Sequence, residues 1–405
     1  MRSCRVCCAS IAPFMTFGRM PMANGFLWPD EFAEEYFYEL QPSFCAACGT
    51  FQIIDQPDPR RLFHDKYAFF TRTSRRMVAH FQAYAGWISE RFLAGTDPFV
   101  VEIGSNDGAM LENFAKRDCR HLGIEPSANA ADEALRFGIA CKVAFFGEET
   151  ARTIHKQHGP ADAIIAANVI CHIPDLNDVG RGVASLLTED GVFVFEEPYL
   201  AAMVEKGSYD QIYDAHVFIF SARAVQNIFA PHGLELTELL PQWTHGGSMR
   251  YVLARKGARA VHPSVERILR DESRQGLDIP ETFERFRERC ERSREALIDL
   301  VRTVRRKGKR VVGYAATAKS TTVLNYCGLG PEDVEFVSDT TPIKQHKFTP
   351  GTHIPVRPYE VFAEDYPDYA LLFAWNHETE ILQKEGEFAA SGGKWIKFVP
   401  QVIVE

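Results

Sequence analysis

The sequence predicts an α/β protein in three parts: a small N-terminal zinc-binding region, a central domain with a Rossmann-like sheet and a second Rossmann-like domain at the C-terminus. Paired cysteines lie near the N-terminus, and strand-like segments alternate with helical ones between residues 99 and 198. A second strand, small-residue loop and helix start follow from residue 310. Such alternation is typical of open parallel sheets, which bind ligands at the carboxyl ends of their strands. We expect domains at residues 1–70, 71–256 and 257–405.

The composition is that of an ordinary soluble globular protein, with 46% hydrophobic and 24% charged residues in a chain of 405. The net charge of −9 shows no basic bias, which disfavours nucleic acid as a partner. No run of about 18 apolar residues and no signal-peptide core is evident. We therefore expect a cytoplasmic enzyme, monomeric and without a membrane partner, whose ten cysteines are reduced unless they bind metal.

The first motif is a double Cys-x-x-Cys pattern, whose two-residue gap lets both thiolates of a pair reach one tetrahedral zinc ion. The pairs stand 38 residues apart, and a hairpin-bearing insert can fill that separation. No histidine accompanies them, so the predicted zinc is structural. The alternative is four unrelated buried thiols, and Cys8 receives no role. The predicted ligands are Cys4, Cys7, Cys45 and Cys48.

Residues 99–108, FVVEIGSNDG, read as a buried strand and a tight glycine loop, and the following AMLENFAKR reads as a helix. Glycine at Gly104 and Gly108 would let the backbone approach a ligand at the helix N-terminus. The motif lacks both the dinucleotide spacing Gly-x-Gly-x-x-Gly and the Lys-Ser/Thr of a P-loop. This disfavours a nicotinamide-dependent oxidoreductase and leaves a small adenosine-like ligand.

A carboxylate ends the next predicted strand, residues 121–125. Glu125 lies 21 residues after Gly104, where an acid is placed to accept both ribose hydroxyls. A solvent-exposed glutamate at a strand end is the alternative. Further strands are expected at residues 161–168 and 191–198.

Together these segments resemble the S-adenosylmethionine-binding core of class I methyltransferases. Over nearly the whole chain, the order of parts is similar to sugar C-methyltransferases that act on nucleotide-linked 4-keto-deoxysugars. The most specific motifs are the paired cysteines and residues 210–221, 245–251, 313–320 and 373–377. The resemblance implies S-adenosylmethionine and zinc as cofactors and methylation of the carbon next to the ketone, with C3 favoured over C5.

Forming a carbon–carbon bond beside a ketone requires a base and donors that stabilise the enolate oxygen. Histidine is the natural base at neutral pH, and a tyrosine hydroxyl can donate to the oxyanion. Tyr213 and His216 would share a face on a helical turn. A histidine in an aromatic stretch is usually a core residue, but the resemblance assigns His216 as the base, with Tyr213, Tyr67 and His172 positioning or polarising the keto-sugar.

The remaining candidate sites rest on residue patterns together with the resemblance. Residues 310–320 form a small-residue loop before a helix, where a lysine and hydroxyls suit a pyrophosphate; the alternative is a close-packed turn with a solvated lysine. The cofactor-binding candidates are Glu102, Gly104, Asn106, Asp107, Glu125, Phe145 and Asn168. The substrate-binding candidates are Lys319, Ser320, Lys344, Arg250, Asn376 and His377.

Three features depart from the family pattern. Ala215 stands where a glutamate usually precedes the catalytic histidine, so Asp214 is a candidate substitute. Ala144 replaces a carboxylate at the adenine edge. Residues 68–76 are basic and aromatic, where the family pattern leads us to expect a small, polar loop. These departures keep two alternatives open: O- or N-methylation of a small metabolite, and a zinc-bearing binding protein without activity. Residues 261–309 are charged and read as a connecting helix with a solvated face.

Overall fold

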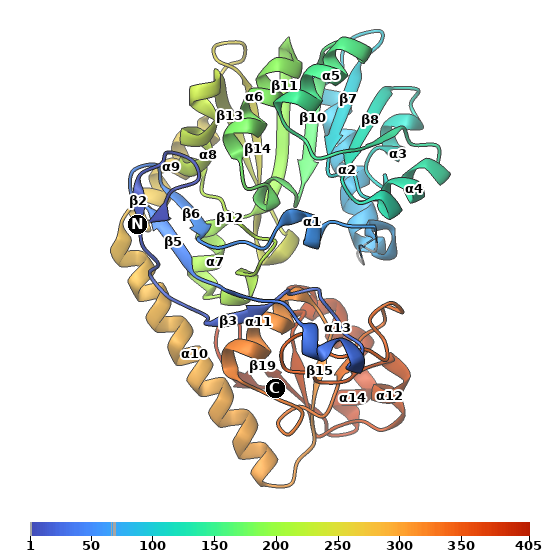
Figure 1. Ribbon diagram of the computed structural model, residues 1–405, viewed down its shortest axis with the longest axis vertical. Helices are drawn as coiled ribbons and strands as arrows, with labels where there is room; N and C mark the ends of the chain where they lie inside the picture. Colours follow the sequence, from blue (N-terminus) through green and yellow to red (C-terminus); the bar gives the residue numbers. More distant parts are fainter. Residues whose placement is uncertain (1, 66, 68–69) are drawn as a thin grey trace.

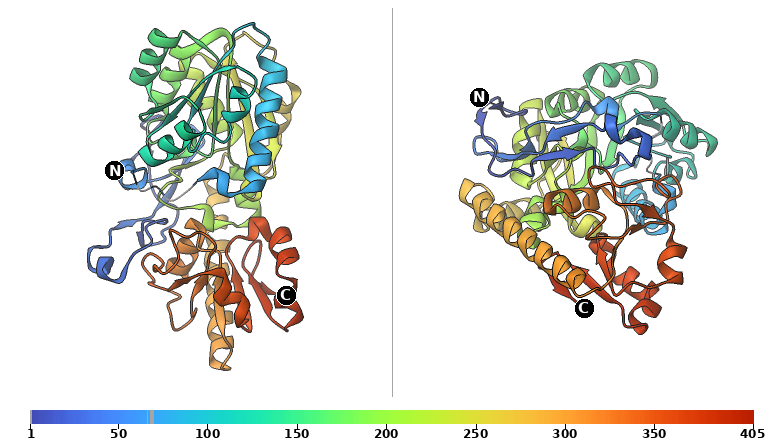
Figure 2. Two further views of the ribbon diagram at one scale, coloured as in Figure 1. Left: turned by 90° about the vertical axis from the view of Figure 1, so that its right-hand side faces the viewer. Right: turned by 60° about the horizontal axis from the view of Figure 1, so that its bottom comes forward.

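The computed structural model describes residues 2–65, 67 and 70–405. Figure 1 shows two α/β units stacked along the long axis, with the N-terminal region lying against both and a long helix beside the lower unit. The two further views in Figure 2 show the same separation into an upper and a lower unit.

The N-terminal region is built from short antiparallel pairs. One strand from far along the chain, β12 (Phe218–Ile219), joins β5 and β6 to form a three-stranded sheet. The elements of this region are β1 (Arg2–Ser3), β2 (Ser10–Ile11), β3 (Arg19–Pro21), η1 (Pro29–Glu34), β4 (Phe37–Glu39), β5 (Pro42–Cys45), β6 (Thr50–Ile53) and α1 (Pro59–Leu62).

The central sheet has seven strands in the order β13-β14-β11-β10-β7-β8-β9. The strands from β11 to β9 are parallel, and β14 runs antiparallel to both of its neighbours. Their bounds are β7 (Phe99–Ile103), β8 (Arg120–Glu125), β9 (Cys141–Val143), β10 (Ala161–Ala167), β11 (Leu187–Pro198), β13 (Leu234–Gln242) and β14 (Ser248–Arg255). Buried aliphatic and aromatic side chains cover both faces, as the near-continuous apolar runs of parallel strands require.

Helices flank this sheet, and one is shorter than expected. Only α3 (Glu112–Ala115) forms where the sequence predicts a helix from residue 109. The Asn113 side chain donates to the carbonyls of Ala109 and Met110, both at 3.1 Å, and so competes with helical bonding there. The other helices are α2 (Arg75–Phe92), α4 (Ala128–Arg136), α5 (Glu148–His158), α6 (Leu176–Leu186), α7 (Leu200–Lys206) and α8 (Ala222–Phe229).

Two helices connect the α/β units: α9 (Pro263–Arg274) and α10 (Pro280–Arg306). The charged face of α10 is exposed, and its apolar stripe, which includes Phe283, Phe286 and Leu297, is buried. Phe283 packs on Phe14, Phe44 and Phe51 of the N-terminal region, and α10 also contacts α11 and β15 of the C-terminal unit, so the helix joins these two parts.

The C-terminal unit is a second Rossmann-like sheet, as the sequence predicts. Its six strands have the order β17-β16-β15-β18-β19-β20 and are parallel except β20. The strands are β15 (Val311–Tyr314), β16 (Val337–Ser338), β17 (Val356–Arg357), β18 (Tyr369–Leu372), β19 (Lys394–Lys397) and β20 (Ile403–Val404). The helices are α11 (Ala318–Cys327), α12 (Tyr359–Glu364), α13 (Glu378–Lys384) and α14 (Gly386–Ala390). No helix in the described part of the chain is long and apolar enough to cross a membrane.

Candidate active site

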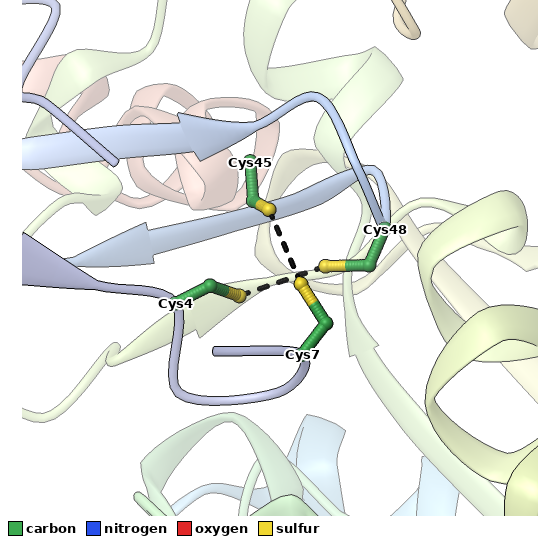
Figure 3. A group of neighbouring side chains, drawn as sticks. All are labelled: Cys4, Cys7, Cys45 and Cys48. Carbon is green, nitrogen blue, oxygen red and sulfur yellow. Dashed lines mark hydrogen bonds between the residues drawn. The ribbon is translucent and has the colours of Figure 1, made fainter. Parts of the chain in front are cut away.

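The four predicted metal ligands come together in the N-terminal region (Figure 3). The sulfur of Cys4 lies 3.6 Å from that of Cys48, and the sulfur of Cys7 lies 3.5 Å from that of Cys45. Four thiolates around a tetrahedral zinc ion at about 2.3 Å would be about 3.8 Å apart. The cluster therefore fits zinc with little adjustment and has no water-bearing position, which suits a structural ion.

This metal region is joined directly to the predicted catalytic segment. Gln52 donates from Nε2 to the Cys4 sulfur at 3.0 Å, and the same residue faces Phe218 across the β6–β12 ladder. The Ile53 amide donates to the Val217 carbonyl at 2.8 Å. Phe218 lies only two residues after His216, so the zinc region supports the backbone that carries this histidine.

The pairing of Tyr213 with His216 arises from a turn, because residues 213–217 form no helix. The His216 amide donates to the Tyr213 carbonyl at 3.0 Å, which brings the two side chains onto one side. The Tyr213 hydroxyl lies 2.6 Å from Nε2 of His216, and Nδ1 lies 2.8 Å from the Gln211 carbonyl oxygen. A carbonyl only accepts, so Nδ1 carries the proton and Nε2 keeps its lone pair.

The surroundings hold both groups in the neutral form. Burial lowers the pKa of His216 well below its ordinary value, and the neighbouring His172 adds to that effect. Burial raises the pKa of the Tyr213 hydroxyl well above its ordinary value, with further contributions from Cys171 and Asp214. A neutral imidazole beside a protonated phenol is the pair required for proton abstraction and oxyanion stabilisation.

The other two predicted catalytic residues lie around this pair. The ring of His172 stacks on that of His216 with centroids 5.5 Å apart, and burial lowers the pKa of His172 to about 4. The pKa of Tyr67 is raised by burial and by the carboxylates of Glu125 and Asp214. The centroid of the Tyr67 ring lies 5.6 Å from that of Phe63, which lies 5.6 Å from that of His172, and Asn129 donates to the Tyr67 carbonyl at 2.9 Å. Sequence reasoning missed Cys171, which forms a compact group with His172 and His216.

Asp214 does not replace the missing glutamate as a partner of the imidazole. Its Oδ2 accepts from the Ala23 amide at 3.0 Å and its Oδ1 from the Ala215 amide at 2.9 Å. The Ala23 carbonyl in turn accepts from the Thr321 hydroxyl at 2.8 Å, so Asp214 fastens the turn to the N-terminal region and to α11. The Gln211 carbonyl orients the imidazole instead.

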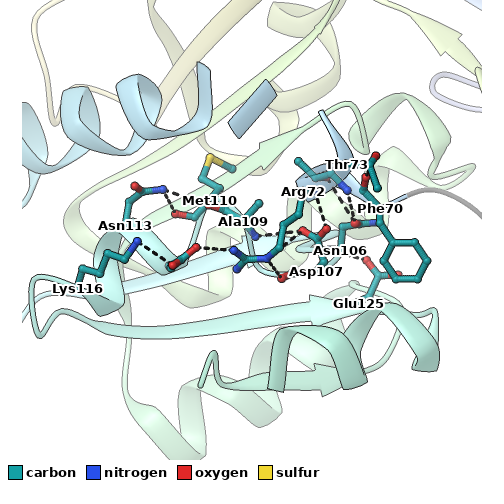
Figure 4. Close-up of polar contacts among 12 residues, drawn as sticks. Phe70, Arg72, Thr73, Asn106, Asp107, Ala109, Met110, Asn113, Lys116 and Glu125 are labelled. Carbon is teal, nitrogen blue, oxygen red and sulfur yellow. Dashed lines mark hydrogen bonds and ion pairs between the residues drawn. The ribbon is translucent and has the colours of Figure 1, made fainter. Parts of the chain in front are cut away.

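The glycine loop is closed by Glu125 (Figure 4). Its carboxylate accepts from the Asn106 amide at 2.9 Å and from the Ser127 amide at 2.8 Å. Gly104 has a structural requirement besides the ligand approach expected from the sequence: a Cβ there would meet the Val169 side chain at 2.4 Å, and the residue has a φ of +66°. Close packing and a left-handed backbone require this glycine, whatever ligand the loop holds.

A segment missed by sequence reasoning covers the same loop. The Thr71 amide donates to Oδ1 of Asn106 at 3.1 Å, and the Arg72 amide donates to Oδ2 of Asp107 at 2.8 Å. The Arg72 guanidinium pairs with Glu112 at 2.5 Å. The side chains of Asn106 and Asp107, predicted to bind cofactor, thus also hold residues 71–72. Residues 68 and 69 of this basic, aromatic segment lie outside the described residues.

The remaining cofactor candidates line the strand ends near this loop. Glu102 and Asn168 each have one buried side-chain oxygen with no hydrogen-bond partner in the described part of the chain. Burial, Asp107 and Glu125 raise the pKa of Glu102 well above its ordinary value. Phe145 is 46% exposed, so its ring is available for stacking. Unpartnered buried acceptors beside a glycine loop suit a ligand that carries hydroxyl and amine donors.

Lys319 lies at the N-terminus of α11, close to the other substrate candidates from the C-terminal unit. Its Nζ donates to Oδ1 of Asn376 at 3.0 Å and lies 4.6 Å from the Trp375 ring centroid. Burial lowers the pKa of Lys319, as does its neighbour Lys206. His377 directly follows Asn376, and its pKa is lowered by burial and by Lys319.

Two substrate candidates form hydrogen bonds within the loop that precedes α11. Lys344 donates to the Ala316 carbonyl at 2.8 Å. The hydroxyl of Ser320 takes part in a capping box with Thr317, accepting from its amide at 3.0 Å. Both contacts shape the turn after β15, where the sequence predicts an anion site.

Arg250 lies in a separate buried cluster. It donates from Nε to Glu196 at 2.6 Å, and His80 lies 2.6 Å from the second oxygen of that carboxylate. Its guanidinium packs on Tyr84 and Trp87 with centroid distances of 4.0 Å and 4.6 Å. These contacts engage the guanidinium with Glu196 and two aromatic rings, and the role of Arg250 in substrate binding stays a prediction.

Comparison with known proteins matches this architecture part by part. The family models that match describe a putative zinc binding domain at residues 4–63, a methyltransferase domain at 77–239 and a C-methyltransferase C-terminal domain at 243–400. The chain is 34% identical over 401 residues to C-methyltransferase NovU of Streptomyces niveus, covering 98% of this chain and 95% of that protein.

Solved structures give weaker likenesses. A SAM-dependent methyltransferase from Anabaena variabilis is 18% identical, with a TM-score of 0.34, over 43% of this chain and 84% of that one. Magnesium protoporphyrin IX methyltransferase from Synechocystis is 13% identical, with a TM-score of 0.35, over 48% of this chain and 91% of that one. The assignment of the chain rests on the sequence matches.

Proposed function

This chain belongs to the family of S-adenosylmethionine-dependent C-methyltransferases with an N-terminal zinc-binding domain, and we propose that its substrate is a nucleotide-linked 4-keto-deoxysugar. In this proposal the methyl group is joined to the carbon next to the ketone, with C3 favoured over C5. S-adenosylmethionine supplies the electrophilic methyl group. The proposed domain limits are residues 1–70, 71–256 and 257–405.

The observation that carries the proposal is the lone pair on Nε2 of His216, which is fixed by the Gln211 carbonyl on Nδ1. A reaction at oxygen or nitrogen needs no base that removes a proton from carbon, whereas C-methylation does. In our account Nε2 takes the proton from the carbon beside the ketone, and the electron pair moves onto the keto oxygen. Because the Tyr213 hydroxyl lies 2.6 Å from Nε2, the substrate would displace it from that lone pair, and the hydroxyl would then donate to the keto oxygen.

The enolate oxygen must be stabilised by donors that remain protonated. The raised pKa values of Tyr213 and Tyr67 keep both phenols protonated at neutral pH. The lowered pKa of His172 keeps that ring neutral, so it can donate without adding a charge. In the proposed reaction these three side chains hold the keto oxygen while the carbon attacks the methyl group.

The nucleotide diphosphate is assigned to the C-terminal domain. Lys319, Asn376 and His377 gather at the carboxyl ends of β15 and β18, where open parallel sheets bind ligands. Lys344 reaches the same loop through the Ala316 carbonyl. These contacts support an anion site in this domain, separate from the glycine loop of the central domain.

The experiment is a methyl-transfer assay on a panel of nucleotide-linked 4-keto-deoxysugars, with the methylated position read by NMR. We expect a product with a new carbon–carbon bond, at C3 in preference to C5. Matched 4-hydroxy sugars are the control and should give no product, because they lack the activated hydrogen. Methylation at an oxygen or nitrogen atom, in either set of substrates, would contradict the proposal.

A further inference from the structure

One loop of the central domain, residues 244–246, has an unusual backbone conformation and no role in the proposed mechanism. Within η6 (Thr244–Gly246), His245 has φ +54° and ψ +20°, the left-handed region that histidine seldom occupies. The next residue, Gly246, has φ +81°, and a Cβ there would meet the Trp375 ring at 2.2 Å. The loop therefore packs closely on η7 (Trp375–His377) of the C-terminal domain.

The side chain that this loop presents is the imidazole of His245. His245 is half-buried, and its imidazole makes no hydrogen bond with the described residues. Its pKa is lowered to about 3 by burial first and then by Lys319, His377 and His172. A left-handed histidine without a hydrogen bond is unfavourable for folding alone, and such outliers cluster at ligand sites.

The groups that surround His245 are mostly hydrogen-bond donors. Among the described residues, Lys319 donates to one acceptor, the side-chain oxygen of Asn376, and it therefore retains donor capacity. Asp210, whose charge acts on Lys319, is fully buried and accepts from Nε1 of Trp375 at 2.7 Å. Glu380, whose charge acts on His377, lies 3.9 Å from Arg76. Donors without an accessible acceptor form a site for an anion.

We propose that His245 binds a phosphate oxygen of the substrate's diphosphate, and that with Lys319 and His377 it forms an anion site shared by the central and C-terminal domains. This inference rests on the proposed function, since it takes a nucleotide diphosphate as the ligand. It adds a residue from the methyl-transferring domain to the binding of the nucleotide diphosphate, which remains attached to the sugar, and thereby fixes the sugar relative to His216.

The test is calorimetric titration of the zinc-loaded, full-length protein with thymidine diphosphate and uridine diphosphate. His245→Gly should weaken the binding of the diphosphate that the wild type prefers by about tenfold, the value of one hydrogen bond to a charged group. Binding of S-adenosylhomocysteine should not change. The Tm should not fall, because glycine adopts a positive φ without strain. His245→Asn, which keeps an N–H donor and tolerates the left-handed region, should lose less affinity.

His155, on the exposed face of α5, provides the control: His155→Ala should bind both ligands as the wild type does. Equal diphosphate affinity in the wild type and His245→Gly would overturn the inference and leave the proposed function intact. A wild type that binds neither diphosphate would instead remove the nucleotide from the proposed function, and this inference with it.

Discussion

The hydroxyl of Tyr213 lies 2.6 Å from Nε2 of His216, and the opposite ring nitrogen lies 2.8 Å from the Gln211 carbonyl oxygen. The imidazole is thus held between one donor and one acceptor, which fixes its tautomer without a carboxylate. Ala215, the departure from the family pattern that most endangers catalysis, therefore removes no group on which the orientation of His216 depends. This arrangement leads to the following predictions.

Replacing the base should slow methyl transfer without disturbing the cofactor site. His216→Asn should lower kcat by about 10²-fold or more, the usual contribution of a positioned base. Asparagine retains a polar side chain, and the contacts of His216 in the described part of the chain are with Tyr213, Gln211 and His172. Titration with S-adenosylmethionine should give the wild-type Kd. Turnover at the wild-type rate would exclude His216 as the base.

The pH dependence follows from the direction of the His216 shift. Because burial lowers its pKa well below the ordinary value of about 6.5, the ring remains unprotonated as the pH falls through 6. The acid limb of kcat/KM should therefore lie below pH 6.5. Asp214 has a pKa raised to about 6 by burial, so Asp214→Asn is the control for a limb of carboxyl origin. A limb above pH 6.5 that survives in Asp214→Asn would contradict this account.

Zinc loss should affect folding and catalysis together. Cys45→Ser should release the metal, and the free energy of unfolding should drop, because a structural zinc site contributes directly to folding. Because β12 pairs with β6 of the zinc-binding region, loss of the metal should also destabilise the segment that carries His216 and lower activity. Bound zinc and thermal unfolding are the measurements. Cys8→Ser, at an exposed cysteine outside the metal cluster, should leave both unchanged. A metal-free wild type that is fully folded would contradict the prediction.

Glu125 should control the affinity for S-adenosylmethionine. Its carboxylate holds the amides of Asn106 and Ser127, and its remaining lone pairs are the predicted ribose acceptors. Glu125→Ala should raise the Kd at least tenfold, since a charge-assisted bond is worth about 1.5–3 kcal/mol. Glu149→Ala, at the start of α5, is the matched control. An unchanged Kd in Glu125→Ala would remove the ribose role.

The domain contact at Gly246 can be tested with two glycines of similar backbone. Gly246→Ala adds a Cβ that meets Trp375 at 2.2 Å, whereas Gly257→Ala, at φ +77°, has nothing within 4 Å. The second change should cost about 1–2 kcal/mol of backbone strain. The first should cost about 1–3 kcal/mol more through overpacking. An equal decrease in the free energy of unfolding for the two variants, measured with denaturant, would contradict a tight contact between Gly246 and Trp375.

The elements and site residues that could be predicted from the sequence are those that a short, local sequence motif specifies. Sequence spacing predicts the cysteine cluster, the strand at residues 99–103 and the acid that ends the next strand, Glu125. The structure contains the cysteine cluster and the two strands, β7 and β8. The short α3 was predicted too long, because the competing bonds of Asn113 depend on its own side chain and not on helical periodicity.

Contacts between distant segments could not be predicted in this way. Hydrogen bonds link Asp214 to Ala23 and Ala23 to Thr321, and so connect three separate parts of the chain. No local sequence motif predicts these bonds. The cover of Thr71 and Arg72 over the glycine loop is similar, although its basic, aromatic composition was visible. The pairing of Arg250 with Glu196 depends on antiparallel register, since these residues face each other across β11 and β14.

The central claim, that His216 removes a proton from carbon, is tested most directly by hydrogen exchange. The substrate identified in the panel assay is incubated in D₂O with enzyme and S-adenosylhomocysteine, and its mass is followed in time. We predict that the wild type incorporates one deuterium at the carbon next to the ketone and that His216→Asn does not. Methyl transfer by a wild type that catalyses no exchange, or exchange that persists in His216→Asn, would contradict the account.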